Sequence, residues 1–165
     1  MTTPQPKTAI FAGGCFWGLE HLFRSVDGVL DADSGYSGGH VPNPSYRQVC
    51  TGTTGHAEAV RVTYDPSRVS YADLAKAFFE FHDPTQLNRQ GPDIGTQYRS
   101  VLFYADEAEH EAGRELVRLL TDSGYRVATA LEPRAPFWRA EEEHQNYLAK
   151  HPLRGCHIPV RRFRQ

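Results

Sequence analysis

The 165-residue chain lacks an excess of positive charge, a long apolar run and a set of paired cysteines. Its formal net charge is −2 at pH 7, so nothing in its composition supports binding to a phosphate backbone. The apolar runs are far too short to cross a bilayer. Residues 1–7 are polar and lack the apolar stretch of a secretory signal. These absences predict a cytoplasmic globular protein that binds neither nucleic acid nor membrane.

Cysteine is scarce, with Cys15, Cys50 and Cys156 as the only copies. An odd number of widely spaced cysteines is not a disulfide framework, and without a C-x-x-C pair there is no zinc-ribbon pattern. We therefore expect no bound metal. Cys50 follows Val49 in a segment that we expect to return to the core, and we interpret it as a buried residue without a role.

Apolar periodicity divides the chain into interspersed strands and helices. Strands are expected at residues 8–12, 29–35, 58–64, 98–104 and 125–131, and helices from residue 16 onward and at 71–81, 106–121 and 140–149. This mixture predicts a mixed sheet with packed helices in one domain covering residues 1–165. We expect residues 1–7 to be flexible and residues 151–165 to form an irregular, mobile tail.

Two long segments rich in glycine, proline and polar residues interrupt this pattern, at residues 37–55 and 83–96. Long loops inside compact domains usually have a function. Tyr46, Asp93 and Tyr98 lie in or beside these loops. Each of the three would be ordinary alone, so their candidacy as site residues depends on the chemistry of the rest of the chain.

Cys15 stands between the Gly13-Gly14 pair and the expected start of a helix at Phe16. The N-terminus of a helix lowers the pKa of a thiol, because its N–H groups and dipole favour the thiolate. Phe16 and Trp17 could form an apolar cradle for a small group such as a methyl. A buried structural cysteine in an aromatic core explains Cys15 alone equally well.

Glu58 begins another expected strand, within the run Thr54-Gly55-His56-Ala57-Glu58. The H-x-E triplet occurs in zinc deaminases, but their downstream P-C-x-x-C motif is missing here. Glu58 could pair with an arginine. It could also be a buried acid that keeps a proton to donate at neutral pH.

The run Gly14-Cys15-Phe16-Trp17-Gly18 resembles the signature of the A-type peptide methionine sulfoxide reductases. Further segments resemble blocks of that family in the same order, from about residue 8 to the tail. They are GYSGG at 35–39, NPSY at 43–46, TGHAEAV at 54–60, YDP at 64–66, HDPT at 82–85, RQGPDIGTQYRS at 89–100, AE at 140–141 and HQNYL at 144–148. Several ordered blocks are much more specific than one five-residue motif.

The resemblance implies an α+β fold with two layers and a ferredoxin-like βαβ core. It also implies an oxidoreductase that converts the S epimer of methionine sulfoxide, alone or within oxidised proteins, to methionine. Cys15 would attack the sulfur, and protonated Glu58 would bind the oxygen and donate its proton. Phe16 and Trp17 would hold the methyl group. Tyr46 and Tyr98 would bind the oxygen, and Asp93 would organise the site.

Cys156 matches the C-terminal resolving cysteine of that family, which would form a disulfide with Cys15. Thioredoxin, or dithiothreitol in vitro, would then be the reductant, with no bound cofactor. The chain departs from one common form of the family, because Gly155 replaces a tyrosine before Cys156 and no cysteine follows it. We therefore expect a single resolving step in a monomer.

Two other functions fit part of the pattern. In cysteine-dependent acyl transfer, His56 would activate Cys15 and Asp93 would orient the histidine. In a non-catalytic module, Phe16, Trp17 and tyrosines would form an aromatic cage for a methylated ligand. The first leaves Cys156 without a role, and the second predicts that Cys15→Ser keeps full function.

Overall fold

The computed structural model describes residues 5–151 and 157–163, and Cys156 therefore lies outside the described residues. The elements follow one another along the chain, with η1 and η2 denoting 3-10 helices. They are β1 (Lys7–Gly13), α1 (Phe16–Arg24), β2 (Val29–Ser37), α2 (Tyr46–Cys50), β3 (Ala57–Tyr64), α3 (Tyr71–Phe81), β4 (Arg89–Gln90), β5 (Asp93–Ile94), η1 (Thr96–Tyr98), β6 (Ser100–Tyr104), α4 (Glu107–Asp122), β7 (Ala130–Pro133), β8 (Phe137–Arg139), η2 (Glu142–His144) and α5 (Tyr147–Lys150).

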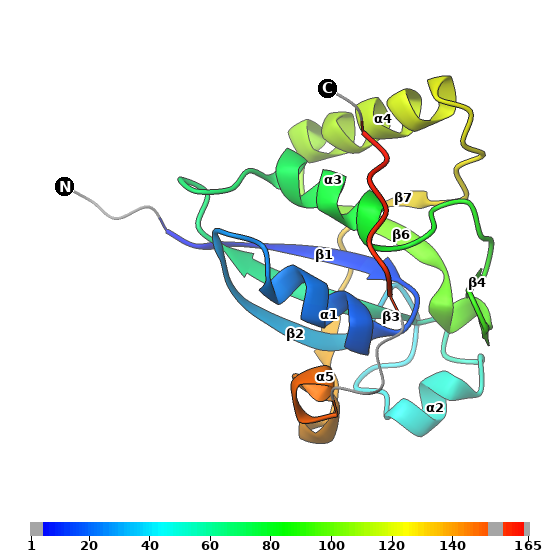
Figure 1. The fold of residues 1–165 in the computed structure, drawn as a ribbon. Coiled ribbons are helices and arrows are strands. Elements are labelled where there is room, and N and C mark those ends of the chain that lie inside the picture. The colour runs from blue at the N-terminus through cyan, green and yellow to red at the C-terminus, as the bar shows by residue number, and fades with distance from the viewer. Residues whose placement is uncertain (1–4, 152–156, 164–165) are drawn as a thin grey trace.

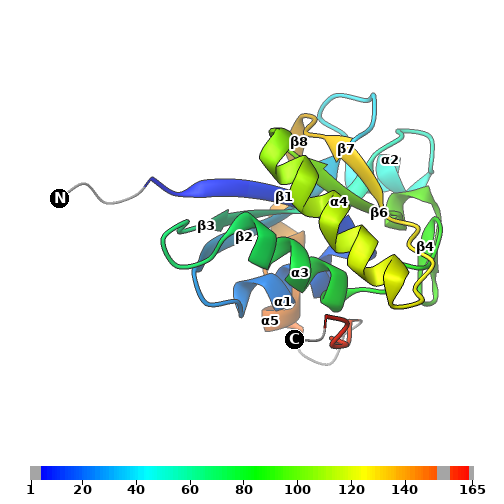
Figure 2. The same ribbon diagram turned by 90° about the horizontal axis from the view of Figure 1, so that it is seen from above.

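One mixed sheet runs through the molecule in the strand order β7-β6-β1-β3-β2-β8. The strands β6 and β7 are parallel, and the other neighbours are antiparallel. The succession β1-α1-β2-β3-α3-β6 gives the inner order β6-β1-β3-β2, which is the split βαβ arrangement of ferredoxin-like folds (Figures 1 and 2). The α+β class and the ferredoxin-like core expected from the sequence are confirmed.

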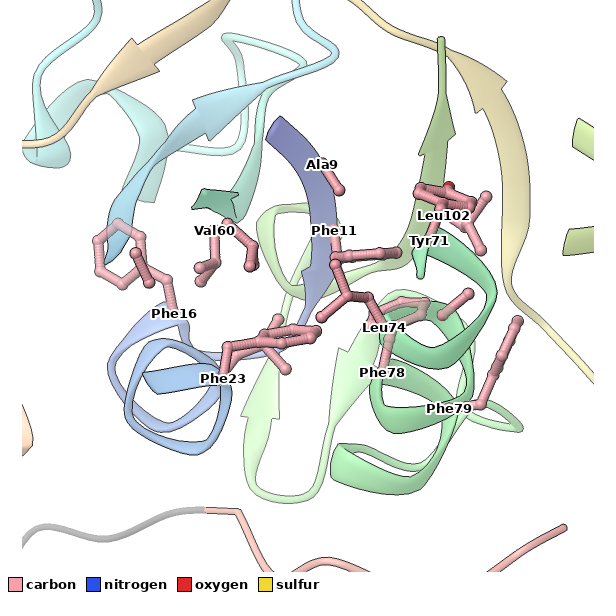
Figure 3. Packing of buried hydrophobic residues seen from close by; sticks show 14 of the residues in the cluster. Ala9, Phe11, Phe16, Phe23, Val60, Tyr71, Leu74, Phe78, Phe79 and Leu102 are labelled. Carbon is pink, nitrogen blue, oxygen red and sulfur yellow. The ribbon is translucent and has the colours of Figure 1, made fainter. Parts of the chain in front are cut away.

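The main core lies between the sheet and the helices α1 and α3. Phe11 of β1 packs between Phe23 of α1 and Phe78 of α3, with ring centroids 5.2 and 5.0 Å away (Figure 3). The alternate residues Ile10 and Ala12 belong to a second, smaller apolar cluster. Because β1 is buried on both faces, its sequence is a continuous apolar run rather than an alternating one.

Side-chain caps explain why two helices begin where the sequence predicts. Ser70 precedes α3, where its hydroxyl accepts from the Asp73 N–H and the Asp73 carboxylate accepts from the Ser70 N–H. Asp106 caps α4 by accepting from the Glu109 N–H. Each such cap contributes roughly 1 kcal/mol because it satisfies N–H groups that have no partner inside the helix.

Several predicted boundaries are wrong for local reasons. The first long loop contains α2, because Ser45 and Gln48 form a capping box. The second contains the β4–β5 hairpin, and Tyr98 lies in η1 rather than in the following strand. The strand predicted at residues 125–131 begins only at Ala130. The helix predicted at 140–149 is replaced by η2 and α5, because Asn146 has a φ of 51°.

Residues 157–163 contain no helix or strand, as expected for the tail. They run along α3, where the Val160 N–H donates to the Glu80 carbonyl at 2.9 Å. The Glu80 carboxylate accepts from the Arg162 N–H at 2.8 Å. This part of the tail is therefore attached to α3. Within the described residues, we find no helix with the length and apolar character needed to span a membrane.

Candidate active site

Cys15 lies where the sequence predicts, between the end of β1 and the start of α1. The strand ends at Gly13, and Cys15 is the N-cap residue of the helix, with a φ of −59° and a ψ of 123°. Its side chain is half-buried. The N–H groups and the positive end of the α1 dipole are directed toward this position, and both favour a thiolate there.

Gly14 permits the turn that presents Cys15. Its φ is 87°, and a Cβ placed on it would lie 2.6 Å from Cβ of Gln90 and 3.3 Å from Nε2 of His157. The Gln90 side chain is itself fixed, because its amide oxygen accepts from the Asp83 N–H and its amide nitrogen donates to the Asp83 carbonyl. The hairpin loop and the tail therefore both contact the turn before Cys15.

Glu58 lies at the same end of α1 as Cys15. Its side chain is only 1% exposed, and its Oε1 accepts a hydrogen bond of 3.2 Å from the Phe16 N–H. Phe16 is the residue directly after Cys15, so β3 delivers a buried carboxyl group to the peptide next to the thiol. The burial of Glu58 fits the buried-acid interpretation, and the Phe16 N–H makes a pairing with an arginine unnecessary at Oε1.

Tyr46 and Tyr98 approach Glu58 from two other elements, α2 and η1. Burial raises the pKa of each hydroxyl far above its ordinary value, and the negative charge of Glu58 raises it further. Asp93 of β5 and Cys15 also act on Tyr98. Both phenols therefore keep their protons at neutral pH and can donate hydrogen bonds.

The two aromatic residues after Cys15 differ in exposure. Phe16 is fully buried and stacks on Tyr46, with ring centroids 6.3 Å apart. Trp17 is half-buried, and its ring lies parallel to that of Tyr147 with centroids 3.7 Å apart. The Trp17 indole N–H donates to Nδ1 of His144 at 3.2 Å. The orientation of the indole is therefore fixed from the C-terminal part of the chain.

The contacts of His56 do not fit the acyl-transfer hypothesis, in which this histidine would activate Cys15. Its Nδ1 accepts from the Gly39 N–H at 3.0 Å, and its Nε2 is 2.6 Å from the Val41 carbonyl oxygen. In a neutral imidazole one nitrogen accepts and the other donates, so Nε2 donates to the Val41 carbonyl. Backbone groups of the loop therefore occupy both ring nitrogens. His56 therefore orders the loop after β2.

The expectation that Cys50 is buried is wrong. Cys50 is exposed at the end of α2, and its thiol makes a hydrogen bond with the Tyr46 side chain. It also lies close enough to Tyr98 to raise the pKa of that hydroxyl. We expected residues 37–55 to be a loop, so the sequence did not predict that Cys50 lies beside Tyr46. The capping box makes residues 46–50 a helix, and this helix carries both side chains.

Sequence reasoning also missed the supporting roles of Glu141 and His144. The Glu141 carboxylate accepts from the Tyr36 hydroxyl and from the Tyr46 N–H, both at 3.1 Å. Among the residues that the structure describes, one trio of possible metal ligands comprises Glu141, Glu143 and His144. Glu141 and Nδ1 of His144 already accept hydrogen bonds from the site, so the trio fits a supporting role better than a metal centre. The family-like blocks at 140–141 and 144–148 contain both residues, and this resemblance could have indicated that they belong to the site.

Comparison with known proteins gives a consistent result. The sequence model described as peptide methionine sulfoxide reductase matches residues 7–165. Peptide methionine sulfoxide reductase MsrA of Methanothermobacter thermautotrophicus is 54% identical over 161 residues, covering 96% of this chain and 95% of the relative.

Solved structures show the same similarity. Reduced Mxr1 from Saccharomyces cerevisiae is 39% identical with a TM-score of 0.84, covering 96% of this chain and 92% of Mxr1. Mxr1 in complex with Trx2 aligns with a TM-score of 0.62 and 27% identity, covering 94% of this chain and 90% of that one.

Proposed function

Because the chain belongs to the peptide methionine sulfoxide reductase family of oxidoreductases, we propose that it reduces the S epimer of methionine sulfoxide through Cys15. The observation that carries this proposal is the hydrogen bond from the Phe16 N–H to Glu58. It brings a buried acid next to a cysteine at a helix N-terminus, and sulfoxide reduction needs such a pair. The thiolate attacks sulfur, while the acid protonates an oxygen that is otherwise a poor leaving group.

In the first step, the Cys15 thiolate attacks the sulfoxide sulfur and Glu58 transfers its proton to the sulfoxide oxygen. Tyr46 and Tyr98 donate hydrogen bonds to that oxygen, a role that their raised pKa values support. Asp93 organises the site beside Tyr98. The products are methionine and Cys15 sulfenic acid, so the sulfoxide is reduced and the thiol is oxidised.

Phe16 and Trp17 provide the apolar surface that accepts the terminal methyl group. The indole of Trp17, which is half-buried and fixed by its hydrogen bond to His144, supports this role. A pocket with hydroxyl and carboxyl donors on one side and aromatic rings on the other suits a group with a polar S=O beside a methyl. Two aromatic side chains held by stacking lose little entropy when the substrate binds.

Cys156 then attacks the sulfenic acid, which gives a Cys15–Cys156 disulfide and water. A thioredoxin reduces the disulfide by exchange, and the complex of yeast Mxr1 with Trx2 supports this partner. The enzyme acts as a monomeric single domain in the cytoplasm, on methionine S-sulfoxide alone or within oxidised proteins. It needs no bound cofactor, and it repairs oxidised proteins.

The two other functions have less support. The backbone contacts of His56 remove the base that acyl transfer requires. An aromatic cage needs open ring faces around a cation, whereas Phe16 is fully buried against Tyr46.

The test is turnover of the separated S and R epimers of a blocked methionine sulfoxide with dithiothreitol, comparing the parent chain with Cys15→Ser. We expect reduction of the S epimer alone and no reduction by the variant. A folded parent protein that reduces neither epimer would overturn the proposal, and ester or amide substrates for acyl transfer would be tried next.

A further inference from the structure

The described part of the tail returns to the turn that carries Cys15. Nε2 of His157 lies 2.8 Å from the carbonyl oxygen of Gly13, the last residue of β1. His157 is half-buried, whereas the next residue, Ile158, is 85% exposed. The tail thus directs the His157 side chain toward Gly13, which lies two residues before Cys15 in the sequence.

Protonation does not remove this hydrogen bond. A carbonyl oxygen can only accept, so Nε2 of His157 carries the hydrogen and donates it. The neutral tautomer with a hydrogen on Nε2 and the imidazolium both have this donor. The contact between tail and turn is therefore available across the pH range in which a thiolate reacts.

A second attachment fixes the direction of the tail beyond His157. The Val160 N–H donates to the Glu80 carbonyl, and the Glu80 carboxylate accepts from the N–H groups of Arg162 and Phe163. The Phe163 ring packs edge-on against Phe79 of α3, with centroids 6.4 Å apart. The tail is thus held at α3 and at the Gly13 turn, and His157 makes the contact nearer to the nucleophile.

We propose that His157 is a positioning residue for the resolving step, which rests on the function proposed above. Cys156 precedes His157 by one peptide bond, and consecutive Cα atoms are about 3.8 Å apart. Anchoring His157 to Gly13 therefore gives the resolving thiol a short tether to the turn of Cys15. A short tether raises the effective concentration of one thiol at the other sulfur.

The step that His157 assists is balanced. The sulfur of Cys156 attacks the sulfur of Cys15 sulfenic acid, an S–S bond forms and the S–O bond breaks. The hydroxide leaves as water with the proton of the Cys156 thiol. Cys15 is reduced from sulfenic acid to the disulfide level and Cys156 is oxidised to it. His157 exchanges no electrons and only holds the chain.

The experiment measures the two steps separately in a single turnover without reductant. His157→Leu removes the donor, and we expect methionine to form at the parent rate but the disulfide to form about fivefold to tenfold more slowly. This range corresponds to about 1 to 1.4 kcal/mol, which is the contribution of one hydrogen bond. His157→Gln keeps a terminal N–H and should recover most of the rate. Ile158→Ala, in the adjacent exposed residue, is the matched control and should match the parent.

Each outcome distinguishes this proposal from the proposed function. A parent protein that forms no methionine or no disulfide contradicts the proposed function itself. A parent that forms both, with His157→Leu equally fast in disulfide formation, overturns the positioning role alone. Slowing of methionine formation by His157→Leu would also overturn it, because His157 would then act on the Cys15 turn in the first step. Turnover of His157→Leu with dithiothreitol should equal that of the parent, since a small thiol attacks the sulfenic acid directly.

Discussion

At the scale of single residues, Glu58 experiences two opposing influences. Its burial disfavours a negative charge on the carboxyl group. The Phe16 N–H and the N-terminus of α1 favour the carboxylate that remains once the proton has left. The helix end that promotes the Cys15 thiolate therefore also stabilises the product of proton transfer from Glu58.

Replacement of Glu58 separates its proton from its hydrogen bonds. Glu58→Gln keeps an oxygen for the Phe16 N–H and an amide donor for the sulfoxide oxygen, so we expect it to retain part of the activity. Glu58→Ala loses the proton and both contacts, and kcat/KM should fall about 10²- to 10⁴-fold. The rate of methionine formation in a single turnover measures both effects.

Glu111→Gln is the control for removing a carboxylate, because Glu111 is exposed on α4. It should leave the rate unchanged. If Glu58→Gln and Glu58→Ala lost the same fraction of the rate, the hydrogen bonds of Glu58 would not contribute to catalysis. Its proton would then account for the whole effect of Glu58 on the rate.

The sequence indicated the position of Cys15 through local signals, a glycine pair followed by helical spacing. It could not indicate that Phe16 donates to Glu58, since 42 positions separate the two residues and only the pairing of β1 with β3 brings them together. Cys50 was misplaced for a similar reason. The capping box that forms α2 is a local signal, but the polar composition of residues 37–55 concealed it.

At the scale of elements, the segment that follows β8 is attached to three earlier elements. Gln145 exchanges two hydrogen bonds with the backbone of Ser34 in β2, and the Asn146 N–H donates to Glu20 of α1. His144 accepts from Trp17 of α1, and Glu141 contacts Tyr46 of α2. Polar groups of this segment therefore form hydrogen bonds with other elements rather than with each other along a helix. This is why the single helix predicted at 140–149 does not form.

The consequence for function is that His144 should determine how firmly Trp17 is held. We expect His144→Ala to raise KM several-fold, because the indole N–H loses its acceptor and the ring loses its fixed orientation. His144→Asn offers an oxygen near the position of Nδ1 and should recover much of the loss. Steady-state kinetics with the S epimer and indole fluorescence would measure these effects.

A matched control for this change is His151→Ala, in an exposed histidine of the same region. It should preserve KM, although His151 also contacts the Tyr147 ring. If His144→Ala left KM and the indole fluorescence unchanged, the orientation of Trp17 would not depend on this hydrogen bond.

At the scale of the whole molecule, the central position of β1 links the site to the core. β1 pairs with β3, which carries Glu58, and with β6, which follows Tyr98. A buried imidazole, His82, packs beneath the last residue of β1, since a Cβ on Gly13 would lie 2.9 Å from Cγ of His82. Its Nδ1 and Nε2 lie 2.6 Å from the Phe78 carbonyl and the Ser100 hydroxyl. The pairing order of the sheet was available only from the family resemblance, since periodicity shows strands but not their neighbours.

Burial lowers the pKa of His82 from 6.5 to about 3, although its hydrogen bond to the Phe78 carbonyl opposes the shift. Between these pH values the unfolded chain binds a proton at His82 that the folded chain does not. The contribution of His82 to stability is therefore fully present above pH 6.5 and is lost as the pH falls toward 3, by about 1.4 kcal/mol per pH unit.

Urea denaturation at several pH values between 4.5 and 7.5 tests this expectation, with the parent compared with His82→Gln. The variant should be less stable at neutral pH, because it leaves space beside Gly13 and Phe78, but its unfolding free energy should fall less steeply with acid. His21→Gln, in an exposed histidine of α1, should keep the slope of the parent. Equal slopes in the parent and His82→Gln would mean that the imidazole takes up no extra proton on unfolding, and the acid sensitivity of the fold would then have to arise from its carboxylates.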